Sequence, residues 1–234
     1  MTNFRGIGLA VFACLTVAGC GDGAPVAADK GSSAENSVQS VNPAPVDPDA
    51  RLIVAFGDSL YAGYGLDREQ GFAPELEKAL KAEGLSVAVH NAGVSGDTTA
   101  AGLARLGFAL DGLPRKPDLV IVGLGGNDML RGIGPEQTRA NLDAILTELD
   151  RRQIPAMLTG MLAAPNLGAD YSAAFNPIFP ELARKHSVPL YPFFLEGVVG
   201  NAALMLPDSI HPNAAGVDVV IGKLTPQVAQ ALAD

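Results

Sequence analysis

Two short motifs of this sequence together hold a serine, a histidine and an aspartate that could form a nucleophilic triad. Ser59 lies in Gly-Asp-Ser-Leu directly after the apolar run 52–56, and Asp208 and His211 lie three positions apart near the C-terminus. A serine hydroxyl needs an imidazole to take its proton, and the imidazole needs a carboxylate to hold its tautomer. Gly-Asp-Ser alone is also ordinary turn chemistry, with Ser59 or Asp58 capping a helix.

The chain has three histidines, and their sequence surroundings favour His211 as the base. His90 ends a predicted strand, whereas His186 ends a predicted helix, where the helix dipole stabilises a cation. His211 alone has an aspartate in the adjacent turn. The spacing of the histidines fits no metal site, and no cluster of carboxylates accompanies them. We therefore expect no metal.

The glycines and the serine motif also fail to match other common site motifs. Segment 123–128 fits the first two glycines of the dinucleotide fingerprint, but Asp128 stands where the last glycine or alanine belongs. Ser59 is not in a Gly-x-Ser-x-Gly elbow, because Leu60 and Tyr61 follow it. The first departure argues against a dinucleotide-binding site, and the second argues against an ordinary α/β-hydrolase. We expect no cofactor.

Two further segments, Asn91–Thr98 and Gly125–Asp128, each follow a strand-like apolar run. With the Ser59 and His211 motifs they resemble the sequence blocks of the SGNH (GDSL) hydrolases, in the family's order. The resemblance runs over nearly all of residues 51–234. It is nearest to the bacterial periplasmic thioesterase, arylesterase and lysophospholipase type, and it includes the segments 102–106 and 188–194.

The resemblance implies a role for each residue of these blocks. Ser59 would be the nucleophile, with His211 and Asp208 completing the triad. The amide of Ser59, the amide of Gly96 and the side chain of Asn127 would form the oxyanion hole. Gly96 also suits a turn before a helix, and an asparagine after two glycines is common in loops. We assign Asp97 and Asp128 to caps and loop hydrogen bonds, and Asp58 to the local scaffold of the serine turn.

The implied activity is hydrolysis of small-molecule carboxylic esters or thioesters through an acyl-enzyme. Four apolar residues next to the blocks are predicted to form an acyl pocket, although each could equally be a core residue: Met129, Leu130, Leu162 and Leu167. An alternative is an O-acetyl esterase of carbohydrate or peptidoglycan, but the chain has no Trp and four Tyr for sugar contacts. A non-catalytic binding lipoprotein is a further alternative, and we would expect it to have lost a catalytic residue.

Short apolar runs alternate with segments of helical periodicity. This pattern predicts a parallel sheet covered on both faces. We expect a three-layer α/β sandwich with a mostly parallel five-stranded sheet, and the resemblance implies the flavodoxin-like SGNH-hydrolase architecture. Ligands of such sheets bind beyond the carboxyl ends of the strands, where Ser59, Gly96 and Asn127 all fall. The predicted strands are 52–56, 85–90, 119–124, 156–161 and 188–191, and the predicted helices are 72–83, 98–110, 135–152, 171–185 and 213–231.

The N-terminus carries an export signal in this interpretation. Residues 1–19 have the charge, apolar run and small residues of a signal peptide, and Cys20 follows Ala-Gly as in the lipobox of bacterial lipoproteins. Residues 20–50 lack aromatic side chains and are rich in Ala, Asp, Ser, Pro and Gly, which predicts a disordered tether before a domain at 51–234. We expect an exported protein, lipid-anchored to a bacterial membrane and facing the periplasm. A formal charge of −9 argues against nucleic acid as a partner.

Overall fold

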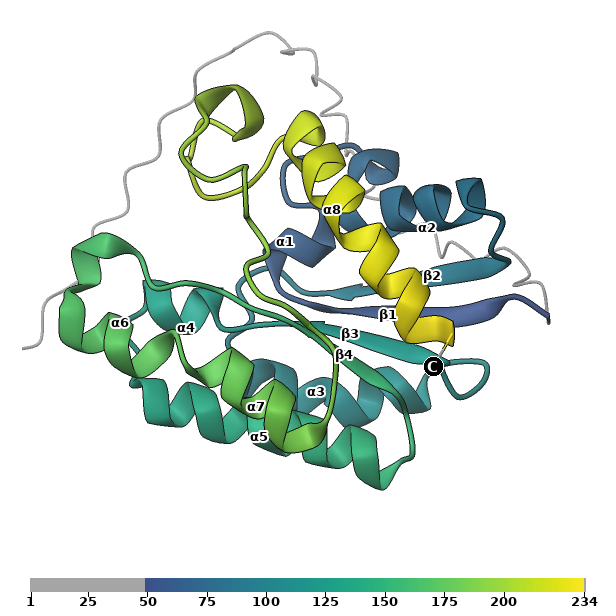
Figure 1. Ribbon diagram of the computed structural model, residues 1–234, viewed down its shortest axis with the longest axis horizontal. Coiled ribbons are helices and arrows are strands. Elements are labelled where there is room, and N and C mark those ends of the chain that lie inside the picture. The colour runs from purple at the N-terminus through teal and green to yellow at the C-terminus, as the bar shows by residue number, and fades with distance from the viewer. Residues whose placement is uncertain (1–48, 234) are drawn as a thin grey trace, which may run out of the picture. The chain divides into compact units, whose positions relative to one another are not determined.

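The computed structural model describes residues 49–233, and five strands within them form one sheet in which every neighbouring pair is parallel. The spatial order is β2-β1-β3-β4-β5, so the chain crosses to one side of β1 and then to the other (Figure 1). The predicted parallel sheet is therefore confirmed. The strands are β1 (Arg51–Gly57), β2 (Val87–Gly93), β3 (Leu119–Gly123), β4 (Ala156–Thr159) and β5 (Leu190–Tyr191).

Helices cover both faces of the sheet, as the alternating pattern predicts. Figure 1 shows α2 and α8 on one face, with α3, α5 and α7 on the other. The α-helices are α1 (Ser59–Ala62), α2 (Phe72–Ala82), α3 (Thr99–Asp111), α4 (Gly126–Leu130), α5 (Pro135–Arg151), α6 (Ala169–Phe175), α7 (Ile178–His186) and α8 (Ala214–Ala233). The described residues also form three single turns of 3-10 helix, η1 (Arg68–Gln70), η2 (Pro165–Leu167) and η3 (Ala202–Leu204).

The neighbouring strands β2, β1 and β3 end at the same level. Gly57 at the end of β1 pairs with Gly93 of β2 and with Gly123 of β3. A side chain on Gly57 or Gly123 would occupy the space of the Tyr61 ring, which is buried across the strand ends. Tyr61 is anchored there by a hydrogen bond of 2.8 Å between its hydroxyl and Thr159 Oγ1. The glycines therefore allow α1 to lie directly on the edge of the sheet.

The prediction of one continuous helix over 171–185 is wrong, because this segment forms two helices, α6 and α7. Pro177 is the N-cap of α7, and it has no N–H with which to continue the hydrogen bonds of α6. The side chain of Asn176, at the break, accepts a bond of 2.8 Å from the Ala163 amide. The break therefore ties these helices to the loop after β4.

Strand ends differ from their predicted positions by a few residues. β2 continues to Gly93, so His90 lies within the strand, whereas β4 stops at Thr159 and β5 has only two residues. These ends are set by pairing with neighbours rather than by the apolar run itself.

The N-terminal predictions fall almost entirely outside the described residues. The signal segment 1–19, Cys20 and most of the tether 20–50 therefore stay predictions. Ala50, the last residue of that tether, is buried, and its carbonyl accepts a hydrogen bond from Arg115. Within residues 49–233, no helix combines the length and the apolar character that crossing a membrane requires.

Candidate active site

Ser59 is the first residue of α1, immediately beyond the end of β1. Asp58 caps this short helix, because its Oδ1 accepts a hydrogen bond of 3.0 Å from the Leu60 amide. The cap was predicted from the Gly-Asp-Ser motif. It holds the half-buried Ser59 at the carboxyl edge of the sheet, where β1 and β3 are neighbours and the chain direction of the crossovers reverses.

His211 lies between Ser59 and Asp208. Its Nε2 is 2.8 Å from Ser59 Oγ, and its Nδ1 is 2.7 Å from Asp208 Oδ2. Asp208 Oδ1 accepts further bonds from the amides of Ile210 and His211, at 2.9 and 3.0 Å. These backbone donors lower the pKa of Asp208 to about 2, so the carboxylate stays charged at neutral pH. The serine, histidine and aspartate chosen from the sequence are thus joined in one chain of hydrogen bonds.

The loop that carries Asp208 and His211 is held at its base. The amide of Leu206 donates to His211 O at 2.7 Å, and Met205 forms a β-bridge with Pro212. Asn213 then begins α8 by accepting a hydrogen bond of 3.0 Å from the Gly216 amide. The long helix α8 therefore fixes the position of the imidazole.

Gly96 and Asn127 follow β2 and β3 at the same edge of the sheet. Gly96 has a φ of +86°, a conformation that favours glycine, in the turn before α3. Asn127 lies in the first turn of α4, and its Nδ2 donates to Asp58 Oδ2 at 3.3 Å. Arg131, at the end of α4, donates from Nη2 to Gly96 O at 2.7 Å. The helix α4 therefore contacts both the serine turn, residues 57–60, and the Gly96 loop, residues 94–98.

Asp128 is fully buried and holds α4 against the start of α3. Its carboxylate accepts from the amide and the hydroxyl of Thr99, at 2.8 and 2.5 Å, and from Thr138 Oγ1 at 3.3 Å. Asn141 completes the group by donating to Thr99 Oγ1 at 3.0 Å. The sequence predicted loop hydrogen bonds for Asp128, but its partners on α3 and α5 depend on the packing of those helices.

Asp58 is a buried acid next to the serine, with 3% of its surface exposed. Burial raises the pKa of its carboxyl to about 6, against the lowering effects of the Leu60 amide, the nearby His211 and Asn127. The folded state therefore binds a proton more tightly than the unfolded state. This contribution to stability is complete below about pH 3.8 and is lost as the pH rises through about 6.

We expect Asp58→Asn to raise the free energy of unfolding by about 1–3 kcal/mol at pH 8, and by little at pH 3.5. Asparagine keeps the helix cap but cannot ionise, whereas its amide cannot serve Asn127 as the carboxylate does, so kcat should fall. Denaturant unfolding of both proteins at the two pH values measures the effect. Asp67→Asn, at an exposed acid, is the control. An equal stability difference at both pH values would contradict the assignment.

The four predicted pocket residues divide into two pairs. Met129 is 7% exposed and belongs to the core, where its sulfur accepts from the Ala164 amide at 3.2 Å, and Leu167 packs partly buried against that core. Leu130 and Leu162 are 55% and 44% exposed. Leu130 and Leu162 are therefore accessible to a ligand and Leu167 is partly accessible, whereas Met129 supports the loop after β4.

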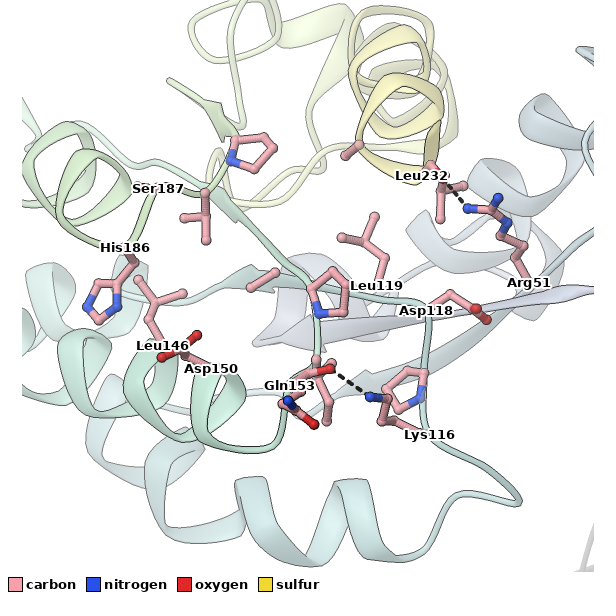
Figure 2. Close-up of a pocket in the computed structure, with 17 residues that line it drawn as sticks. Arg51, Lys116, Asp118, Leu119, Leu146, Asp150, Gln153, His186, Ser187 and Leu232 are labelled. Atoms are coloured by element: carbon pink, nitrogen blue, oxygen red, sulfur yellow. Dashed lines mark hydrogen bonds between the residues drawn. The ribbon is translucent and has the colours of Figure 1, made fainter. Parts of the chain in front are cut away.

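The other two histidines lie away from Ser59. His90 is on β2, and burial lowers its pKa. His186 Nε2 is 2.6 Å from Asp143 Oδ1, a pair separated by 43 residues that the sequence did not indicate. His186 lines a cavity of about 810 Å³ at the amino ends of the strands, and Lys116 and Asp118 line its other side (Figure 2). That cavity is at the opposite edge of the sheet from Ser59.

Within residues 49–233, no group of three or more His, Cys, Asp and Glu side chains is placed to hold a metal ion. The buried acids Asp58 and Asp128 instead accept hydrogen bonds from amides and hydroxyls. Their role is therefore to fix the loops around Ser59.

Comparison with known proteins decides the family. Residues 55–219 match the GDSL-like lipase/acylhydrolase family. The chain belongs to this family. It is 42% identical over 166 residues to esterase TesA of Pseudomonas aeruginosa, covering 71% of this chain and 82% of that protein. It is also 38% identical over 164 residues to thioesterase 1/protease 1/lysophospholipase L1 of Escherichia coli, covering 70% and 76% of the two chains.

Solved structures agree with this assignment. The crystal structure of AlinE4, an SGNH-hydrolase family esterase, superposes with a TM-score of 0.67 at 52% identity, covering 78% of this chain and 97% of that chain. The resemblance, the α/β fold and the class of enzyme predicted from the sequence are confirmed. This GDSL-family chain is a serine esterase or thioesterase.

Proposed function

We propose that Ser59 is the nucleophile of this hydrolase, with His211 as general base and Asp208 as the group that orients His211. The observation that carries the proposal is the 2.8 Å contact between Ser59 Oγ and His211 Nε2, continued by the 2.7 Å contact between His211 Nδ1 and Asp208. With the Asp208 carboxylate accepting from Nδ1–H, Nε2 carries a lone pair directed at the serine.

In the acylation step, Ser59 Oγ attacks the carbonyl carbon of the ester or thioester, and its proton passes to His211 Nε2. The tetrahedral intermediate collapses by expelling the alkoxide or thiolate, which takes the proton from His211. In deacylation, water gives a proton to His211 and attacks the acyl carbon. The acid product then leaves, and Ser59 recovers its proton.

The negative charge on the carbonyl oxygen is held by three neutral donors in this proposal: the amides of Ser59 and Gly96, and Nδ2 of Asn127. The Asn127 amide group has two N–H bonds. One is engaged by Asp58, which orients the second toward the oxyanion. A donor of this kind contributes roughly 10²- to 10³-fold to kcat.

The substrates we propose are short to medium aliphatic or aryl esters and the corresponding thioesters. The exposed Leu130 and Leu162 support an apolar acyl group, each methylene contributing at most ~0.8 kcal/mol. The names of the relatives, which include an esterase and a thioesterase, support the same two bond types. A sugar O-acetyl ester gains little from such side chains, and we keep it as the alternative.

Covalent labelling tests the proposed nucleophile. A fluorophosphonate should add to Ser59 of the folded protein, and peptide mass spectrometry locates the adduct. A panel of p-nitrophenyl esters and acyl thioesters of increasing chain length then measures acyl preference. Labelling at another residue would overturn the assignment of Ser59, whereas a preference for acetylated sugars would overturn only the substrate class.

We further propose that the mature protein is exported and anchored through a lipid on Cys20. The support is the small residues before Cys20 and the short apolar run that precedes them. Wild-type protein should incorporate labelled fatty acid and partition with membranes, and Cys20→Ser should do neither while keeping its activity. Incorporation of label into Cys20→Ser, or none into wild type, would contradict the anchor.

A further inference from the structure

Arg105, on α3, connects the serine turn with the Gly96 loop. Its Nε donates to Asp97 Oδ2 at 2.5 Å, and its Nη2 donates to Gly57 O at 3.0 Å. Its Cζ lies 4.2 Å from the centre of the Phe56 ring. A single guanidinium thus contacts the end of β1, two residues before Ser59, and the residue directly after Gly96.

These contacts lie where the two segments meet. Gly57 O also accepts from the Val94 amide at 3.0 Å, and the Asp97 amide donates to Val94 O at 3.1 Å. The carbonyl of Gly57 is therefore shared by the Gly96 loop and Arg105. The side chains of Arg105 and Asp97 are 22% and 12% exposed, so their charges are largely shielded from water. Removing either partner leaves the other charge partly buried and uncompensated.

The reaction is sensitive to the distance between the two proposed oxyanion donors, the amides of Ser59 and Gly96. Oxyanion donors act when they lie 2.7–3.1 Å from the developing charge, and a misplacement of about 1 Å can cost ~10²-fold in rate. Ser59 supplies one proposed donor and Gly96 another, from two different strand ends. The distance between these two donors depends on the contacts between the end of β1 and the loop after β2. Arg105 makes such a contact, because it donates both to Gly57 O and to Asp97.

We propose that Arg105 is a positioning residue that sets the spacing between Ser59 and the Gly96 amide. Among the described residues its partners are Asp97, Gly57 O and the Phe56 ring, and none of them is a proposed reacting group. Its planar fork provides two donors in fixed relative directions, one for a carboxylate and one for a carbonyl, which an ammonium group cannot reproduce. The inference rests on the proposed function, because it assumes that Gly96 and Ser59 hold the oxyanion.

Arg105→Lys tests the spacing with the charge retained. We expect kcat to fall about 10- to 100-fold with KM within about twofold, since the oxyanion contacts form chiefly in the transition state. Asn127→Ala, which removes a proposed donor outright, sets the upper limit of roughly 10²- to 10³-fold. In Arg105→Ala, millimolar guanidinium should restore part of kcat, whereas the same concentration of sodium chloride should not.

Arg152→Lys is the matched control. The Arg152 side chain is 23% exposed and also serves two partners, Asp111 and Glu148, but it lies at the C-terminal end of α5. Thermal unfolding should shift comparably in Arg105→Lys and Arg152→Lys, whereas kcat should fall only in the first. If both variants lose stability and neither loses kcat, Arg105 is structural and the proposal fails.

The kcat values of Asp97→Asn and Ser59→Ala test the proposal if the arginine variants give no clear answer. If the arginine variants do not fold, Asp97→Asn weakens the same link from the other side and should lower kcat about tenfold. An unchanged kcat there would overturn the proposal. Failure of the proposed function itself is distinguishable, because Ser59→Ala would then retain activity, whereas an error confined to Arg105 leaves Ser59→Ala inactive.

Discussion

Ser59→Ala is expected to lower kcat on a p-nitrophenyl ester by roughly 10⁴- to 10⁶-fold while the protein remains folded. The substitution removes one hydroxyl at the edge of the sheet. In the structure that hydroxyl contacts His211 Nε2, while the helix cap that holds the turn comes from Asp58. Alanine is also favourable at the start of a helix interior. The loss should therefore fall on the chemical step and not on stability.

The measurement pairs steady-state kinetics with labelling. Ser59→Ala should take up no fluorophosphonate, and its unfolding curve should match that of wild type. Ser172→Ala, which changes a serine on α6 whose hydroxyl bonds to Gly168 O, is the control and should label and turn over normally. A Ser59→Ala protein that keeps more than a tenth of wild-type kcat would require another nucleophile.

The convergence of the three blocks was predictable because parallel strands expose their carboxyl ends at one edge. Once the runs before Ser59, Gly96 and Asn127 were interpreted as parallel strands, their loops had to meet. The pairing of Gly57 with both Gly93 and Gly123 shows how closely the strand ends are aligned. The local pair of Asp208 and His211 was equally accessible, since a separation of three residues fits a single turn.

Contacts between distant helices were not predictable in the same way. Arg105 lies in a segment that resembles the family, yet nothing in the sequence says that its guanidinium reaches Gly57 O. That contact depends on the rotation of α3 against the sheet. The pair His186 and Asp143 likewise forms only because α7 packs on α5. Side-chain partners across helices are set by packing geometry, which hydrophobic periodicity defines only to within a face.

Burial also decided features that the residue types left open. Met129 and Leu130 are neighbours in the sequence and equally apolar, but one is in the core and the other is exposed. The raised pKa of Asp58 arises from its burial beneath the serine turn. The division of 171–185 into two helices, by contrast, had a visible signal in Pro177, because proline cannot extend the hydrogen bonds of a preceding helix.

Asp208→Asn is the second large effect that we expect, a loss of about 10⁴-fold in kcat with nearly unchanged stability. Asparagine has the same shape, and its Oδ1 can still accept from the amides of Ile210 and His211. Its Nδ2, however, is a donor directed at His211 Nδ1. The imidazole must then accept at Nδ1 and carry its proton on Nε2, directed at Ser59, where it cannot take the serine proton.

Activities of wild type and Asp208→Asn measured across pH distinguish a loss of His211 orientation from a loss of the charge on Asp208. Backbone amides keep the pKa of Asp208 at about 2, so its native-state contribution is present above about pH 3.8 and is lost only as the pH falls toward 2. Protonation of Asp208 therefore cannot explain a loss of wild-type activity between pH 5 and 7. Asp218→Asn, at an exposed acid on α8, is the control and should keep wild-type kcat. A kcat for Asp208→Asn within tenfold of wild type would show that His211 is oriented by another group.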